Sequence, residues 1–243
     1  MSDSTPKLSL RDLAIEVTRR CNMGCKHCMR GDAQPIDLNP AYLTEFLSHI
    51  DYILDVTLTG GEPSIATDVI SKALSSFKIT KTPLGNFYVV TNGKVVSDSF
   101  LLAMAQWWLY CDENEISAVA LSKDKFHEQV PEENIKKLSS LSFFNEQDKA
   151  TDWDKIPLLA VGRAKHMPNT RPTSKYDGNI EYEEYDDEVM INNTITLTAT
   201  GDILTVCDYA YDDYDKYKIA NINEPDWFEK FVKHIKPLCS EKR

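Results

Sequence analysis

Short apolar runs alternate with longer amphipathic segments up to about residue 165 of the chain. Apolar runs of about four to eight residues are typical of buried strands, and apolar residues repeating at roughly 3.6 positions are typical of helices. We expect strands at residues 13–18, 53–60, 86–92, 116–122 and 155–161, and helices at 39–50, 67–77, 98–109 and from about 131. This alternation predicts an α/β fold whose parallel sheet is built with right-handed crossovers.

The pattern changes after about residue 165. A turn-rich segment is followed by residues 194–207, which predict a hairpin around Gly201-Asp202. Residues 224–235 predict a closing amphipathic helix with an apolar side of Trp227, Phe228, Phe231 and Ile235. We therefore expect a core at 1–165, and an acidic linker, hairpin and capping helix at 166–243.

Composition and charge narrow the possible partners. The 243 residues carry a formal charge of −11, which opposes non-specific binding to nucleic acid or to an anionic membrane. No signal peptide or membrane-spanning stretch is found in the sequence, so we expect a reducing cytoplasm, where clustered cysteines favour metal or redox chemistry. The Tyr/Asp-rich stretches 181–188 and 208–215 suit solvated loops, or an electronegative wall that attracts a cationic substrate.

Three cysteines lie within eight residues, in CNMGCKHC (21–28), directly after the first expected strand. A structural zinc site or an ordinary four-cysteine cluster needs four protein ligands, and this loop supplies Cys21, Cys25 and Cys28. Zinc would need a fourth donor; His27 is too constrained for that role, and His49 would be a guess. Three thiolates can instead hold three irons of a [4Fe–4S] cluster and leave the fourth iron open to a substrate or cofactor.

Four further motifs follow expected strands, where parallel α/β sheets place their sites. They are TGGEP (59–63), TNG (91–93), LSKDKFHE (121–128) and VGRAKHM (161–167). Taken singly, a Gly-Gly or Asn-Gly pair is an ordinary turn, and an isolated Arg is usually a surface residue. In LSKDKFHE, the position of Asp124 is equally typical of a residue that caps the next turn. We interpret His127 as an ordinary loop histidine rather than a catalytic base, because the sequence indicates no partner for it.

Together, Cys-x3-Cys-x2-Cys after the first strand and Gly-Gly-Glu-Pro after the second resemble the radical S-adenosylmethionine (radical SAM) superfamily. The resemblance implies a partial (β/α)6 TIM-like barrel, one oxygen-sensitive [4Fe–4S] cluster on the three cysteines, and SAM at the open iron. It implies that the residue before the third cysteine packs near the adenine and that the strand-end motifs bind the rest of SAM. The implied SAM-binding residues are His27, Gly60, Gly61, Glu62, Pro63, Asn92, Ser122, Asp124 and Arg163.

The C-terminal region resembles a SPASM or twitch extension, which in relatives carries extra clusters on several cysteines. Only Cys207 and Cys239 remain here. We expect a cap without a cluster, in which Cys207 is a buried apolar residue rather than a ligand.

The function that accounts for most motifs is an enzyme that cleaves SAM to a 5′-deoxyadenosyl radical and abstracts a substrate hydrogen. The resemblance implies a reductant such as flavodoxin or ferredoxin. The tail favours a peptide or protein substrate, while a nucleotide or other small molecule stays open. A non-catalytic iron–sulfur carrier or sensor and a zinc-binding interaction module explain fewer of the motifs. No residue is identified as a catalytic acid, base or radical relay.

Overall fold

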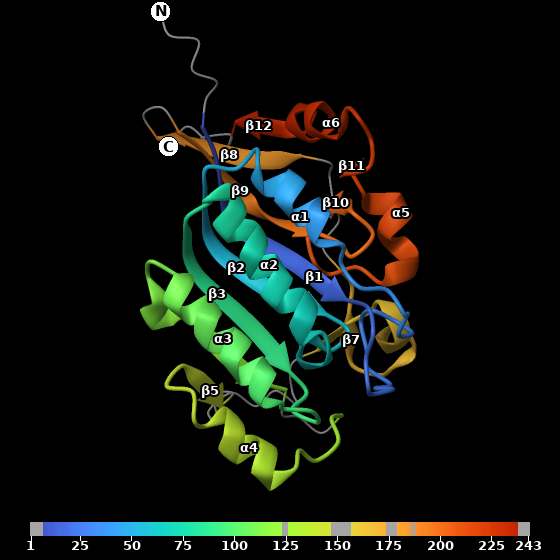
Figure 1. Ribbon diagram of the computed structural model, residues 1–243. Coiled ribbons are helices and arrows are strands. Elements are labelled where there is room, and N and C mark those ends of the chain that lie inside the picture. Colours follow the sequence, from blue (N-terminus) through green and yellow to red (C-terminus); the bar gives the residue numbers. More distant parts are fainter. Residues whose placement is uncertain (1–6, 123–125, 147–156, 174–178, 186–187, 238–243) are drawn as a thin grey trace, which may run out of the picture.

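A parallel sheet forms the centre of the molecule (Figure 1). The structure is a computed structural model that describes residues 7–122, 126–146, 157–173, 179–185 and 188–237. Five strands lie side by side in the order of the sequence, each parallel to the next: β1 (Lys7–Thr18), β2 (Tyr52–Gly60), β3 (Leu84–Thr91), β4 (Ala118–Leu121) and β5 (Phe144–Glu146). The expected α/β class is confirmed.

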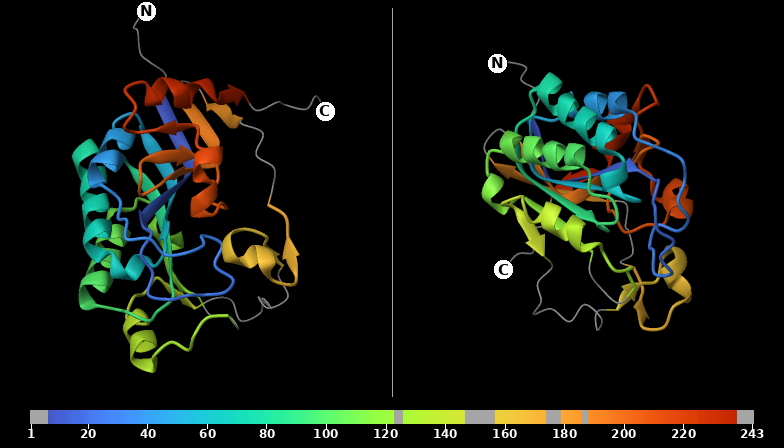
Figure 2. Two further views of the ribbon diagram at one scale, coloured as in Figure 1. Left: turned by 90° about the vertical axis from the view of Figure 1, so that its right-hand side faces the viewer. Right: turned by 60° about the horizontal axis from the view of Figure 1, so that its bottom comes forward.

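Each connection between successive strands of this series holds one α-helix. The helices are α1 (Pro40–Leu47), α2 (Thr67–Thr80), α3 (Asp98–Tyr110) and α4 (Glu132–Leu138). The Asn39 side chain accepts a hydrogen bond from the Ala41 N–H and caps α1 as expected, and Ser97 caps α3 in the same way. Figure 2 (left) shows these helices on one face of the sheet and the segment 157–173 (gold) on the other side.

Aromatic side chains fill the layer between the helices and the sheet. Phe77 and Trp107 are fully buried with ring centroids 5.4 Å apart, and Phe87 of β3 packs on Trp107. The Trp107 indole N–H donates to the Ile70 carbonyl at 3.2 Å, so its polar atom is satisfied. Each such buried side chain contributes about 1.5–3 kcal/mol relative to exposure, which holds the strand ends at fixed positions.

The C-terminal part of the chain adds strands on the other side of β1. Strand β9 (Glu188–Leu197) pairs with β1 in parallel and is followed by antiparallel β10 (Asp202–Leu204) and β11 (Ala220–Asn221). The expected hairpin is confirmed, with Gly201 at φ +84° in its turn. Because β1 lies between β2 and β9, the sheet crosses residue 165, and the division at that residue stays a prediction.

Two further strands and two short helices complete the C-terminal part. Strand β8 (Ile180–Tyr185) pairs with β9 and with β12 (Ile235–Pro237). The helices are α5 (Tyr214–Tyr217) and α6 (Trp227–Lys233). Helix α6 is shorter than the helix expected at 224–235. Ile235, which was expected on its apolar side, is the first residue of β12.

The expected strand at 155–161 does not join the main sheet. Of its described residues, β6 (Leu158–Leu159) pairs with β7 (Thr170–Arg171) in a separate two-stranded sheet. The edge of β4 that this strand was expected to occupy is taken by β5, which pairs with β4 through residues 144–146. The remaining regular segments are 3₁₀ turns: η1 (Pro63–Ile65), η2 (Asn114–Ile116), η4 (Gly162–His166) and η5 (Tyr211–Asp213).

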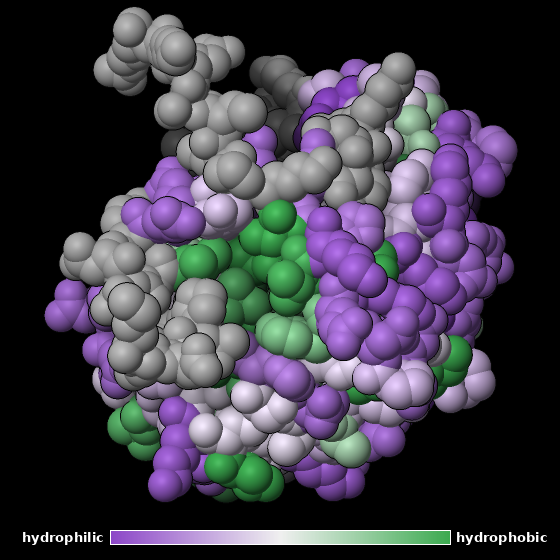
Figure 3. Space-filling view, turned by 90° about the horizontal axis from the view of Figure 1, so that it is seen from above, coloured by the Kyte–Doolittle hydropathy of each residue, from purple (hydrophilic) through white to green (hydrophobic). Residues whose placement is uncertain are grey.

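Seen from the end where the parallel strands begin, the surface carries an apolar area bordered by hydrophilic residues (Figure 3). In the described part of the chain, no helix is both long and apolar enough to cross a bilayer. The carboxyl ends of the strands lie at the opposite end of the molecule, and there the sequence motifs meet.

Candidate functional site

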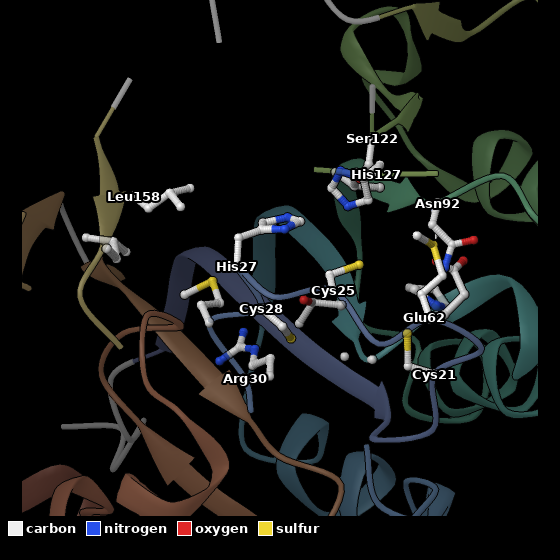
Figure 4. Close-up of a pocket in the computed structure, with 18 of the residues that line it drawn as sticks. Cys21, Cys25, His27, Cys28, Arg30, Glu62, Asn92, Ser122, His127 and Leu158 are labelled. Carbon is white, nitrogen blue, oxygen red and sulfur yellow. Dashed lines mark hydrogen bonds between the residues drawn. The ribbon is translucent and has the colours of Figure 1, made fainter. Parts of the chain in front are cut away.

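A cavity of about 430 Å³ opens at the carboxyl ends of the parallel strands (Figure 4). Its volume lies in the range of about 300–1,000 Å³ that is typical of small-molecule sites. Figure 4 shows the three cysteines around its lower part, Glu62 and Asn92 to one side, and His27, Ser122 and His127 above. The cavity lining includes Cys21, Cys25, His27, Cys28, Gly60, Gly61, Glu62, Pro63, Asn92 and Ser122.

The cysteine loop leaves β1 at Thr18 and brings all three thiols to this cavity. Cys21, Cys25 and Cys28 are free and half-buried. Burial raises the pKa of the Cys25 thiol, and the neighbouring Cys21 and Cys28 raise it further, so the three sulfurs lie within electrostatic reach of one another. A bound iron centre would reverse this effect and hold the thiols as thiolates.

The donor set fits an iron–sulfur cluster better than zinc. Within the described ranges, no three His, Cys, Asp or Glu side chains converge on the position of a single metal ion. A structural zinc site needs four converging donors, whereas a cluster of several irons takes one thiolate at each iron. Three sulfur ligands from one loop, facing one cavity, therefore fit a cluster with an open position.

The two glycines of TGGEP allow the end of β2 to pack against the start of the cysteine loop. Gly60 has φ +142°, and a Cβ there would collide with the Thr18 carbonyl oxygen. A Cβ at Gly61 would collide with the Arg20 carbonyl oxygen. The Gly61 N–H donates to the Thr18 carbonyl at 2.8 Å, so the two loops are joined by their backbones.

Glu62 connects the ends of β2 and β3. Its side chain is 2% exposed, and Oε1 accepts from the Ser64 N–H at 3.0 Å and from the Thr91 hydroxyl at 2.7 Å. Oε2 accepts from the Asn92 N–H at 2.8 Å. Pro63 follows as the buried first residue of η1. The carboxylate therefore positions Asn92, a role that the sequence reasoning missed; its contact with SAM stays a prediction.

Asn92 and Ser122 lie next to each other in space at the ends of β3 and β4. The Asn92 amide donates to Asn22 Oδ1 at 2.8 Å, which ties it to the cysteine loop. The Ser122 N–H donates to the Thr91 carbonyl at 2.9 Å. Both line the cavity, as their predicted roles require, whereas Asp124 lies outside the described residues.

The Gly-Arg-Ala segment packs on the cysteine loop. The Arg163 N–H donates to the Cys28 carbonyl at 2.9 Å, and a Cβ at Gly162, whose φ is +53°, would collide with the backbone of Cys28 and Met29. Arg163 Nη1 lies 3.2 Å from Asp32 Oδ1. The side chain lines a smaller recess beside the cysteines rather than the main cavity, so its pairing with the SAM carboxylate stays a prediction.

An aromatic group forms the upper wall of the cavity. His27 stacks on Phe126 with ring centroids 4.8 Å apart and meets His127 edge-on at 4.7 Å. His127 also lines the cavity, although its sequence context indicated an ordinary loop residue. These rings give a flat surface beside the cysteines, which is compatible with the predicted position of an adenine.

A cluster of tyrosines from 208–215 lies beside the cysteine loop, so the expectation of a solvated loop is wrong for these tyrosines, while the electronegative wall stays a prediction. Tyr209, Tyr211 and Tyr214 are buried, with 3%, 7% and 3% exposed, because they pack around Arg30, which follows the third cysteine. The sequence did carry a signal, since three aromatic residues recur within a short interval between charged ones. Nothing local indicated their partner.

The remaining cysteines differ from the predicted ligands. Cys207 is half-buried, whereas we expected it to be buried among apolar residues. Its thiol donates to Asp208 Oδ1 at 3.6 Å. Burial raises the pKa of Cys207, and the nearby Arg30 partly opposes this. Burial raises the pKa of Cys111 to about 11, so this thiol is inert. Cys239 lies outside the described residues.

Comparison with known proteins supports the expected fold. No family model matches the chain. A segment of 121 residues is 29% identical to "Molybdenum cofactor biosynthesis protein 1" of Drosophila melanogaster, and the match spans 47% of this chain but only 20% of that relative.

Two solved structures resemble the whole architecture. They are native anSMEcpe with bound AdoMet (S-adenosylmethionine) and a Cp18Cys peptide, and the same protein with a Kp18Cys peptide. Their TM-scores are 0.55 and 0.54, at 13% and 12% identity, over 93% and 92% of this chain and 80% of each of theirs. The likeness confirms the expected partial barrel as the fold.

Proposed function

We propose that this chain is a member of the radical SAM superfamily, an enzyme that cleaves SAM reductively and abstracts a hydrogen atom from a substrate. The observation that carries the proposal is the meeting of three thiols from one loop with the Gly-Gly-Glu-Pro turn at one cavity. In this proposal Cys21, Cys25 and Cys28 hold a single [4Fe–4S] cluster. When bound there, such a cluster would supply one electron for cleavage of the carbon–sulfur bond of SAM, which would give methionine and the 5′-deoxyadenosyl radical.

The protein's own residues bind and orient SAM. In this proposal the loop at Gly60 and Gly61, which is fixed against the cysteine loop, binds the methionyl amine. Asn92 and Ser122 present polar groups to the same cavity, and His27 presents a ring. Apolar wall residues exclude the water that would quench a radical; they include Met23, Leu58, Val90, Leu158 and Leu159.

We propose a peptide or protein as the substrate. Two solved structures with a similar fold contain bound peptides. A small-molecule substrate is the second candidate, because the sequence relative is a molybdenum cofactor biosynthesis protein. The proposed electron source is a flavodoxin or ferredoxin.

The test is formation of 5′-deoxyadenosine. Protein reconstituted anaerobically with iron and sulfide is incubated with SAM and dithionite, and the products are identified by mass spectrometry. We expect slow cleavage even without substrate. If fully loaded protein forms no 5′-deoxyadenosine with any reductant, the chain is an iron–sulfur carrier or sensor instead.

A variant pair tests the SAM pocket. Ser122→Ala should weaken SAM binding by about 1 kcal/mol, the usual net contribution of a hydrogen bond, with normal iron content. Ser75→Ala is the matched control. Ser75 is exposed on α2, outside the cavity, and its hydroxyl donates to the Ser71 carbonyl of the same helix. Equal SAM affinity in both variants would remove Ser122 from the pocket, while the cleavage assay would still stand.

A further inference from the structure

A small recess lies beside the cysteine loop, next to the main cavity. It measures about 30 Å³ and is lined by Cys21, Cys25, Cys28, Arg163 and Tyr211. Tyr211 comes from the C-terminal part of the chain and is the one aromatic residue in this lining. The recess therefore brings a phenol to the three predicted cluster ligands.

The Tyr211 hydroxyl oxygen is buried, and it has no hydrogen-bond partner among the described residues. The whole residue is 7% exposed, so bulk water does not replace that partner. Leaving a buried hydroxyl without a partner destabilises the folded protein, so such groups usually mark a missing ligand or a functional role. The Cys28 thiol lies close enough to Tyr211 to affect it electrostatically.

The ring of Tyr211 is held in place from three directions. Its backbone N–H donates to the Arg30 carbonyl at 3.1 Å, and Arg19 lies over its ring with 4.8 Å between the guanidinium carbon and the centroid. Tyr214 packs edge-on against it at 5.7 Å. A hydroxyl on a ring fixed in this way has little freedom to find another partner.

Hydrogen bonds join Arg30, Tyr214, Glu16 and Arg19 in a network beside the Tyr211 ring. Arg30 Nη1 donates to the Tyr209 carbonyl at 2.9 Å and to the Tyr214 hydroxyl at 3.0 Å. The Tyr214 hydroxyl donates to Glu16 Oε2 at 2.7 Å, and Arg19 Nε donates to Oε1 of the same carboxylate at 2.7 Å. These acceptors are engaged by other donors, and the Tyr211 hydroxyl belongs to a residue that lines the same recess as the three cysteines.

We propose that the Tyr211 hydroxyl donates a hydrogen bond to a sulfur of the cysteine-held cluster and thereby sets its reduction potential. The inference rests on the cluster part of the proposed function. Hydrogen bonds to cluster sulfurs stabilise the reduced, more negative state, so they raise the potential. Burial, with the charge of Glu16, raises the pKa of Tyr211, so the hydroxyl keeps the proton that it donates.

The test compares Tyr211→Phe with Tyr217→Phe in reconstituted full-length protein. Tyr217 makes the control because it packs against the tyrosine cluster, stacks on Tyr209 with ring centroids 3.9 Å apart and does not line the recess. Pulsed electron paramagnetic resonance of the reduced cluster should reveal an exchangeable proton coupling in wild type and in Tyr217→Phe. In Tyr211→Phe that coupling should be lost, and the midpoint potential should become more negative.

A second variant covers the case in which Tyr211→Phe assembles no cluster. Difluorotyrosine placed at position 211 keeps the shape of the residue and makes the hydroxyl a stronger donor, so the potential should become more positive. An unchanged potential and unchanged proton coupling in the loaded variants would overturn the proposal. Neither measurement uses SAM or turnover, so the hydrogen bond can be established even if no 5′-deoxyadenosine forms.

Discussion

Gly60 shows how a single residue determines the site. Its φ of +142° disfavours any residue with a Cβ, and that atom would meet the Thr18 carbonyl oxygen. We predict that Gly60→Ala lowers the free energy of unfolding by about 1–3 kcal/mol, the usual cost of such backbone strain, and separates the Gly-Gly-Glu-Pro loop from the cysteine loop. Urea unfolding of the cluster-free protein measures this change.

The control for Gly60 lies in the cysteine loop itself. A Cβ at Gly24 meets nothing within 4 Å, so Gly24→Ala should leave unfolding unchanged. If both variants unfold like wild type, the contact between the two loops contributes nothing to stability.

The sequence alone predicted that the three cysteines lie at one site. It did not predict the hydrogen bonds that fix the loops around them. The Cys-x3-Cys-x2-Cys spacing is local, and it correctly brings Cys21, Cys25 and Cys28 to one cavity. The predicted SAM contact of Glu62 stays a prediction, whereas its hydrogen bonds to Ser64, Thr91 and Asn92 had no local signal in the sequence. Tyr211 was missed because its burial depends on Arg30, far away in sequence.

At the scale of elements, α6 holds the C-terminal part of the chain to α1. Phe231 is fully buried and meets Phe46 edge-on with centroids 6.2 Å apart, and Trp227 stacks on Phe46 at 5.9 Å. We predict that Phe231→Ala destabilises the protein by about 3–5 kcal/mol, the usual cost of emptying a buried aromatic site. Val232→Ala, at a residue that is 43% exposed on the same helix, should change stability far less in the same urea titration.

The repeating strands and helices were predictable because their apolar periods are local. The bounds of α2 and α3 differ from those expected by a few residues. The position of β6 was not predictable from its own residues, because another segment can pair with the same sheet edge. Here β5 pairs with the free edge of β4. The parallel pairing of β9 with β1 has no local signal either.

For the whole molecule, we predict one cluster per chain. Anaerobic reconstitution should give about four iron and four sulfide per chain, because one three-cysteine set faces the cavity and Cys207 contacts Asp208. Cys25→Ala should abolish the brown colour and the bound iron, and Cys207→Ala should keep both. About eight irons per chain, or iron loss in Cys207→Ala, would restore a second cluster to the C-terminal part.

The place of β1 between β2 and β9 has a consequence for how the chain is made. The ribosome synthesises β1 long before β9. The edge of β1 that pairs with β9, where Leu13 lies opposite Ile195, therefore stays unpaired until β9 has been made. Until then the nascent chain carries a row of unpaired backbone groups, which is a template for association with other chains. We therefore expect chaperones to bind the nascent chain after β1 has emerged and to leave only after the β9–β10 hairpin has emerged.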